Sequence, residues 1–331
     1  MQKKWIIKEK ADKEVVRHLS EVLNIDESLA NLLAQRGITT FEEAKSFFRP
    51  ELSKLHDPFL MKDMDLAVER IDKAIANREQ ILVFGDYDVD GTTAVALVYN
   101  FIKNFYDKVH FYIPDRYEEG YGISYKSIDF ANENKYSLII ALDCGIKAIK
   151  KVEYASRLGI DYIICDHHRP GNEIPKAYAV LDPKREDCKY PYKELSGCGV
   201  GFKLAQAYAQ KNNIPFDKLI PHLDLVVVSI ASDIVPITGE NRILAYYGLK
   251  LINTNPRPGI EAILKHCNIC RLDKPKEESN FIFNRELSIS DLVFLVGPRI
   301  NAAGRIESGK NSVKLLICDK DNDYVVKLGE Q

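Results

Sequence analysis

Three short apolar runs, at residues 81–84, 138–142 and 162–165, are each followed closely by acidic or histidine side chains. The runs are rich in branched residues and do not alternate with polar ones, which is typical of parallel strands buried on both faces of a sheet. Helical patterns occupy residues 64–78 and 92–105. This order predicts an α/β fold with a doubly wound, mainly parallel sheet of about five strands.

The polar side chains that follow the runs are Asp86, Asp88 and Asp90, then Asp143, then Asp166, His167 and His168. Because the carboxyl ends of parallel strands meet at one edge of a sheet, we expect these groups to converge there. Carboxylates with one or two imidazoles suit Mn²⁺ or Mg²⁺ better than a structural zinc ion. Two such ions can activate a water and hold a phosphate for in-line attack. The sequence therefore predicts a two-metal phosphoester hydrolase.

Four segments, at residues 86–91, 143–145, 166–168 and 231–236, resemble the four motifs of the DHH phosphoesterases in order and context. Two further stretches carry the resemblance to one branch of that family, the single-strand-specific 5′→3′ DNA exonucleases. They read Leu-Ser-Gly-Cys-Gly-Val-Gly-Phe-Lys-Leu at 195–204 and Gly-Pro-Arg-Ile-Asn-Ala-Ala-Gly-Arg at 297–305. The resemblance extends from about residue 50 to about residue 320.

The resemblance implies a catalytic core that releases 5′-mononucleotides from single-stranded DNA in DNA repair and recombination. We expect Asp143 to bridge two Mn²⁺ or Mg²⁺ ions, with Asp233 as the ligand of the fourth motif. The resemblance makes His167 a direct metal ligand and His168 a donor to the scissile phosphate, while Asp166 orients a histidine. The spacing leaves open which two of the three aspartates at 86, 88 and 90 bind metal.

Arginines and an aromatic residue near the same edge are candidates for substrate binding. Arg116 follows the predicted strand at residues 109–114, and Tyr121 in the same loop is a candidate for stacking on a base or sugar. Arg299, Asn301 and Arg305 belong to the second branch-specific stretch. A guanidinium fork suits phosphate oxygens, but an ordinary surface ion pair is the alternative for each arginine.

The pattern predicts a helical preface at residues 1–55, a catalytic α/β domain at 56–235 and a helical extension at 236–331. Family members continue through a connecting helix into a second lobe with a Gly-Gly-His motif. This sequence ends within what resembles the start of that helix, so we expect an intact metal site and a missing wall of the DNA groove. Whether it is a fragment or a natural short form is left open.

Composition sets further bounds. No stretch approaches the roughly 18 apolar residues of a membrane span, and the start has too brief an apolar segment for a signal peptide, so a cytoplasmic protein is expected. The net charge of −2 gives no bulk attraction to nucleic acid, so DNA binding would need a local basic patch and the metals.

Seven cysteines favour a reducing compartment over a disulfide framework. Cys267 and Cys270 have half of a zinc-knuckle pattern, and free thiols are the favoured interpretation.

Other interpretations are weaker. The glycines at 197, 199 and 201 do not follow a strand, so a tight entry into a helix at 202–211 is favoured over a dinucleotide fingerprint.

A DHH phosphodiesterase acting on short oligonucleotides, cyclic dinucleotides or pyrophosphate remains an alternative, as does a non-catalytic replication scaffold. The scaffold would be expected to lack ligands that are all present here. The expected partners are single-stranded DNA and a helicase or single-strand-binding protein, and the expected state is a monomer.

Overall fold

The computed structural model describes residues 4, 6–274, 281–303 and 309–318. The chain divides into two compact units, Met1–Leu55 and His56–Gln331. Each unit has a hydrophobic cluster of its own. The predicted division near residue 235 stays a prediction.

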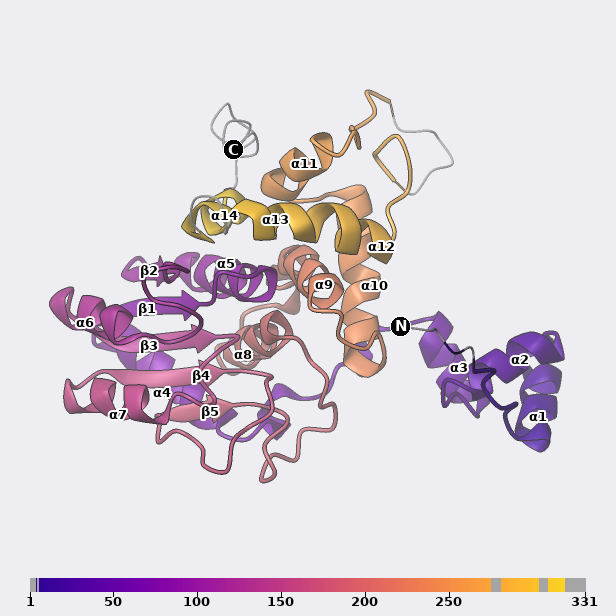
Figure 1. Cartoon of the computed structure of the whole chain (residues 1–331), viewed down its shortest axis with the longest axis horizontal. Coiled ribbons are helices and arrows are strands. Elements are labelled where there is room, and N and C mark those ends of the chain that lie inside the picture. The colour runs from indigo at the N-terminus through magenta and orange to yellow at the C-terminus, as the bar shows by residue number, and fades with distance from the viewer. Residues whose placement is uncertain (1–3, 5, 275–280, 304–308, 319–331) are drawn as a thin grey trace. The chain divides into compact units, whose positions relative to one another are not determined.

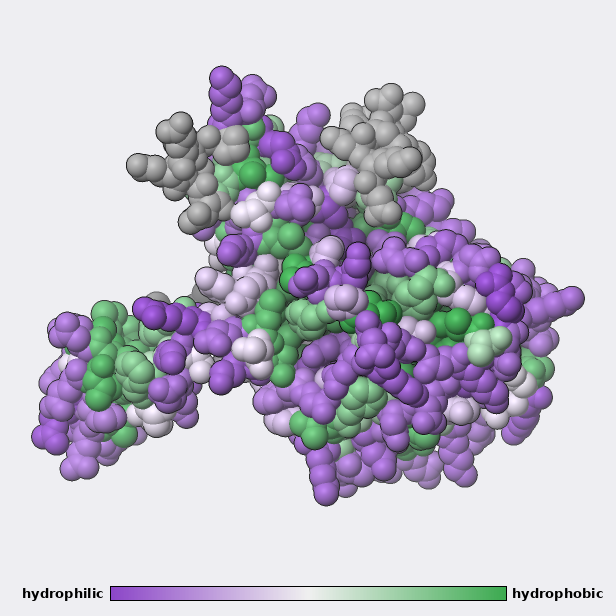
Figure 2. Space-filling model, turned by 180° about the vertical axis from the view of Figure 1, so that it is seen from behind, coloured by the Kyte–Doolittle hydropathy of each residue, from purple (hydrophilic) through white to green (hydrophobic). Residues whose placement is uncertain are grey.

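The N-terminal unit contains α1 (Lys13–Leu23), α2 (Glu27–Ala34) and α3 (Phe41–Phe48). Each helix has a side-chain cap at its start, from Asp12, Asp26 and Thr40, which satisfies amide groups that the helix leaves free. The three helices enclose a small core and leave an apolar groove of about 530 Å³, whose lining includes Leu29 and Phe48. Figure 2 shows this apolar surface in green on the small unit.

The larger unit is built on one sheet of five parallel strands (Figure 1). The strands are β1 (Gln80–Gly85), β2 (Val109–Tyr112), β3 (Tyr136–Leu142), β4 (Asp161–Cys165) and β5 (Ala179–Leu181). Their order is β2-β1-β3-β4-β5, which confirms the predicted doubly wound sheet and its strand number. The chain reverses its direction of travel across the sheet between β1 and β3. Such a reversal opens a crevice beyond the carboxyl ends of the two strands.

Helices cover both faces of the sheet (Figure 1). On one face, α6 (Tyr125–Glu133) and α7 (Ile149–Arg157) bury an apolar cluster with side chains of β1, β3 and β4. On the other face lie α4 (Met64–Ala76), α5 (Val89–Lys103) and α8 (Gly197–Lys211). The strands are buried on both sides, which explains why their sequences are continuously apolar.

The remaining helices of the described residues follow the sheet in sequence. They are α9 (Leu223–Ser232), α10 (Gly239–Thr254), α11 (Pro258–Lys265), α12 (Ile289–Asp291), the π-helical turn η5 (Leu292–Val296), α13 (Gly297–Ala303) and α14 (Gly309–Leu316). Single 3₁₀ turns occur at η1 (Leu52–Lys54), η2 (Pro58–Leu60), η3 (Phe216–Lys218) and η4 (Ile220–His222). Within the described residues, no helix is both long enough and apolar enough to cross a membrane.

Helices α5 and α9 pack antiparallel. Ser229, near the end of α9, donates a hydrogen bond of 2.7 Å to Asp90 at the start of α5. At the opposite ends, the ring of His222 lies 6.5 Å from the ring of Phe101. The pair therefore extends from the crevice at the sheet edge to the far side of the unit.

Candidate metal centre

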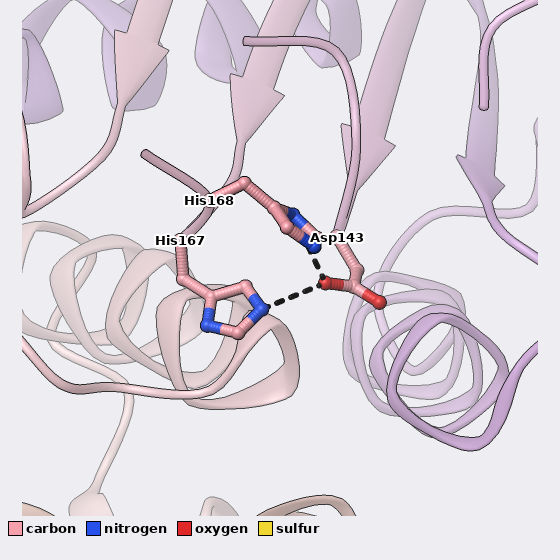
Figure 3. A group of neighbouring side chains, drawn as sticks. All are labelled: Asp143, His167 and His168. Carbon is pink, nitrogen blue, oxygen red and sulfur yellow. Dashed lines mark ion pairs between the residues drawn. The ribbon is translucent and has the colours of Figure 1, made fainter. Parts of the chain in front are cut away.

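The predicted ligand residues converge at the carboxyl edge of the sheet. Asp143 follows β3, and His167 and His168 follow β4, so one atom from each lies within 4.8 Å of the others (Figure 3). A second group of the same size contains Asp90, His167 and Asp233. The two groups share His167, so they form a single cluster drawn from the ends of β3, β4 and α9 and the start of α5.

His167 has the tautomer that a metal ligand requires. Its Nδ1 atom lies 3.0 Å from the carbonyl oxygen of Leu195, which can only accept, so Nδ1 carries the proton and donates. In the neutral ring the Nε2 atom is then an acceptor. It lies 3.2 Å from Asp143, 3.6 Å from Asp233 and 3.7 Å from Asp90, and all three contacts are to carboxylate oxygens. An acceptor facing three acceptors is stabilised by a cation between them.

Asp143 is the most buried carboxylate of the cluster. Burial raises its pKa well above the ordinary value, and the charges of nearby carboxylates, Asp90 and Asp88 first among them, raise it further. Its Oδ1 atom is buried without a hydrogen-bond partner among the described residues, and so is Nε2 of His167. Its backbone has a φ of 58°, a left-handed conformation that aspartate and asparagine adopt more readily than other side chains do.

The start of α8 fits closely against this carboxylate. A Cβ atom on Gly197 would lie 2.5 Å from Oδ1 of Asp143, so only glycine fits there. The amide groups of Gly197 and Cys198 each donate a 2.7 Å hydrogen bond to Asp90. Helix α8 thus begins at Gly197, five residues earlier than predicted, because Ser196 caps it and Asp90 accepts from its free amides.

The three aspartates after β1 have different surroundings. Both oxygens of Asp86 accept backbone hydrogen bonds, from Tyr87 and Gly122, each 2.7 Å long, and burial raises its pKa to about 7. Asp88 caps α5 through Gly91. Burial, more than any other factor, raises the pKa of Asp88, and the hydrogen bond from the amide of Gly91 is the main effect that opposes the rise. Asp90 belongs to the second group and Asp88 lies close enough to raise the pKa of Asp143, whereas Asp86 is in neither group among the described residues.

Asp166 orients the two histidines. Its Oδ1 accepts from the amide groups of His167 and His168 and lies 2.8 Å from Nδ1 of His168, and its Oδ2 accepts from the amide of Ile146. Burial alone would raise the pKa of Asp166, but the hydrogen bond with His168 and the charge of that ring hold the pKa below its usual value. The same bond raises the pKa of His168, whose side chain is 45% exposed.

An aromatic wall runs from His168 away from the cluster. The ring of Tyr121 lies edge-on to His168 at 6.5 Å and to Tyr87 at 6.0 Å. The guanidinium of Arg116 lies over the ring of Tyr87 at 5.2 Å. Tyr121 is half exposed and Arg116 is exposed. The structure thus joins two predicted substrate residues through Tyr87, which the sequence analysis did not select although it lies inside the first motif.

The second branch-specific stretch packs against the end of α9. A Cβ atom on Gly297 would lie 2.6 Å from Oγ of Ser232, the residue before Asp233. Arg299 and Asn301 therefore belong to a helix, α13, that begins close to the cluster, and Arg299 is exposed. Arg305 lies outside the described residues.

Two functional candidates escaped the sequence analysis. Ser229 donates to Asp90, and its position four residues before Asp233 on the same helix face was a usable signal.

Asp182 directly follows β5, as Asp143 follows β3, so the strand-end pattern alone could have selected it. Burial raises the pKa of Asp182 to about 7, and its Oδ2 has no partner among the described residues. Cys267 and Cys270 belong to neither metal-binding group in the described part of the chain.

The chain is similar to known proteins in sequence. Residues 80–230 match the DHH family, N-terminal domain. The single-stranded-DNA-specific exonuclease RecJ of Bacillus subtilis (strain 168) is 38% identical over 96% of this chain and 38% of its own length. The protein of the same name from Escherichia coli (strain K12) is 35% identical over 91% of this chain and 51% of its own length. The chain thus spans about half or less of these curated relatives.

Solved structures show the same architecture. An exonuclease RecJ bound to manganese is 27% identical, with a TM-score of 0.71 over 85% of this chain and 66% of that chain. The RecJ of Thermus thermophilus in complex with Mn²⁺ has a TM-score of 0.78 over 97% of this chain and 44% of that chain. Its identity of 24% limits that second likeness to the fold.

Proposed function

Because residues 80–230 place this chain in the DHH family, we propose that it is the catalytic core of a metal-dependent 5′→3′ exonuclease that acts on single-stranded DNA. The observation that carries the proposal is the contact between Nε2 of His167 and Oδ1 of Asp143, two buried acceptors without a hydrogen-bond partner in the described residues. In the absence of a cation this arrangement is unfavourable, and a divalent ion reverses the sign of the interaction.

The donor set fits two Mn²⁺ or Mg²⁺ ions. We assign Asp88, Asp90, Asp143, His167 and Asp233 as ligands, with Asp143 shared between the ions. Oxygen donors with one imidazole suit these hard ions, and no thiolate enters either group among the described residues. The manganese-bound RecJ structure supports the choice of ion. When bound, such ions acidify a water and neutralise the charge that develops on a phosphate.

The protein's own part is to orient and to transfer protons. The bond between Asp166 and Nδ1 of His168 fixes that ring and favours its protonated form. The ring is 45% exposed, so its Nε2 is free to donate to a phosphate oxygen beside the cluster. Asp86 holds the loop at Gly122, which in turn places Tyr121 next to His168.

The wall of Arg116, Tyr87 and Tyr121 supports a single-stranded substrate. Aromatic rings stack on bases of any sequence, which contributes about 1–3 kcal/mol for each base, and arginine binds phosphate. A duplex keeps its bases stacked inside and cannot offer them to such a wall. The exposed Arg299 and the partly buried Asn301 on α13 are proposed as further contacts to the DNA backbone.

Digestion of labelled substrates tests the proposal. The chain is incubated with Mn²⁺ and with 5′-labelled or 3′-labelled single strands, a blunt duplex, dinucleotides and pyrophosphate side by side. We expect mononucleotide release from the 5′ label first, on single strands only. Preference for dinucleotides or pyrophosphate would favour the alternative enzyme activity. Absence of hydrolysis on every substrate, with Mn²⁺ bound, would favour the non-catalytic scaffold.

Three expectations about the setting of the protein stay proposals. A monomeric state is measured by sedimentation, and binding to a helicase or single-strand-binding protein is measured with purified partners. Location in the cytoplasm is measured by fractionating cells that produce the protein.

A further inference from the structure

A large cleft with both polar and apolar lining lies at the end of the α5 and α9 pair that faces away from the metal cluster. It has a volume of about 1080 Å³ and is bordered by the last turn of α5, the turn η4, the end of α10 and helix α11. None of the residues assigned to the metal centre lines it. Helix α5 alone spans 15 residues, or roughly 22 Å, so the cleft and the cluster are separate places.

The cleft contains cationic groups that no acid neutralises. Lys218 and Lys265 line it, are exposed, and form no ion pair with any residue in the described ranges. Arg257 also lines the cleft, but Asp224 accepts two hydrogen bonds from its guanidinium, of 2.7 and 2.8 Å. Glu261 of the lining is paired with Arg271, so three lysines, Lys103, Lys218 and Lys265, stand without an ion pair against Asp217 among the described residues, and their sum favours an anion.

The rest of the lining combines amide and apolar groups. Asn100 and Asn104 reach the cleft from the end of α5, and neither side-chain amide has a partner within the described residues. A side-chain amide can donate and accept together, which matches the edge of a nucleobase. Ile220, Leu251 and Ile269 supply apolar surface that a planar ring can cover.

His222 gives the cleft a buried polar group. Its side chain lines the cleft and is only 6% exposed, and its Nδ1 has no hydrogen-bond partner among the described residues. One neighbour is the ring of Phe101, at 81° to the imidazole plane, which cannot satisfy a ring nitrogen. A buried histidine with an unused nitrogen is unusual in a merely structural wall.

We propose that this cleft binds a nucleotide, with the phosphate between Lys218 and Lys265 and the base against the asparagines and apolar side chains. Ligand pockets typically measure about 300–1000 Å³, and this cleft can hold a nucleotide with water around it. The inference goes beyond the proposed hydrolysis and does not depend on it, because it uses no residue of the metal centre.

The test is a calorimetric titration without metal. Deoxyadenosine 5′-monophosphate is added to the whole chain carrying Asp143→Asn, in a buffer with a chelator, so that neither catalysis nor bound metal contributes. Deoxyadenosine and inorganic phosphate are titrated separately. We expect saturable binding of the nucleotide at one site. Deoxyadenosine alone and phosphate alone are expected to bind at least about tenfold more weakly, since each makes only part of the contacts of the nucleotide.

Matched double variants identify the site. Lys218→Ala with Lys265→Ala removes two of the cleft cations, while Lys150→Ala with Lys176→Ala removes the same charge from two exposed lysines outside the cleft. Circular dichroism confirms folding of both. The first pair is expected to weaken nucleotide binding at least about tenfold and the second to leave it unchanged. The proposal is overturned by absence of saturable binding, by equal losses in the two pairs, or by phosphate binding as tightly as the nucleotide.

Discussion

The Nε2 atom of His167 lies 3.2 Å from the Oδ1 atom of Asp143, and both are acceptors buried from solvent. The carbonyl of Leu195 accepts from Nδ1 on the other side of the ring, so in the neutral imidazole the proton is on Nδ1 and Nε2 is an acceptor. A divalent cation is the group that satisfies both atoms together. The arrangement of these two residues therefore determines most of what the site can do.

Asp143→Asn is expected to abolish Mn²⁺-dependent hydrolysis, by a factor of about 100 or more, because an amide cannot bridge two cations. Asparagine is the better substitution than alanine, since it also tolerates the φ of 58° at this position. Initial rates on 5′-labelled single strands measure the effect, and an unchanged thermal unfolding curve serves as the folding control. Turnover near that of the parent chain would show that the metal site is wrongly assigned.

The paired histidines are expected to separate binding from turnover. His167→Ala should weaken Mn²⁺ binding, because it removes a ligand that faces three carboxylates. His168→Ala should leave Mn²⁺ affinity within about threefold and lower turnover by about 100-fold, the size of effect typical of a lost proton donor. Titration calorimetry and rate measurements on the same preparations test this. The reverse pattern would exchange the two roles.

Gly197→Ala is expected to damage the centre much more than Gly199→Ala, although both positions lie in the first turn of α8. The added Cβ would lie 2.5 Å from Asp143 at the first position and 3.3 Å from the hydroxyl of Ser196 at the second. We expect Mn²⁺ affinity at least about tenfold lower in the first variant, because the bridging carboxylate must move. Similar metal affinities in the two variants would contradict the close fit.

His222 is expected to make stability fall in mild acid. Burial, together with the charge of Arg257, lowers its pKa to about 4. The unfolded chain therefore takes up the proton near pH 6.5 and the folded chain only near pH 4. The contribution of His222 is complete above about pH 6.5 and is lost as the pH falls toward 4, by up to about 3 kcal/mol.

His222→Gln provides the comparison for that slope. Urea unfolding at several pH values between 7 and 4 gives the free energy of unfolding of both proteins, and the carboxylates common to both cancel in the difference. The parent chain is expected to lose more stability than the variant across this range. Parallel pH dependences would show that the folded state protonates His222 as easily as the unfolded state does.

The sheet and the position of its site were predictable because both depend on local patterns. The apolar runs that became β1, β3 and β4 are buried on both faces, so their sequences carry no alternation that could be confused with a surface strand. Residues that directly follow such strands must lie at one edge. Asp143 and His167 come together for this reason, although 24 positions separate them in the sequence.

The orientation of individual carboxylates was not predictable, because distant backbone groups determine it. Asp86 is turned by the amide of Gly122, 36 positions away, and Asp90 by the amide of Gly197, 107 positions away. Neither partner has a side chain that a sequence pattern could identify. The start of α8 was misplaced for the same reason, since glycines argue against a helix unless a carboxylate accepts from their amides.

Helices α5 and α9, which bring Asp90 and Asp233 together, are made at different times during synthesis of the chain. Asp233 follows Asp90 by 143 residues, and a chain elongating at about 5–20 residues per second needs roughly 7 to 30 s to span that interval. Throughout this time the strands that carry the first proposed ligands exist without the helix that brings the last one. The proposed metal centre would therefore be completed late, and tight binding of metal would report that the chain has been made and folded at least as far as the end of α9.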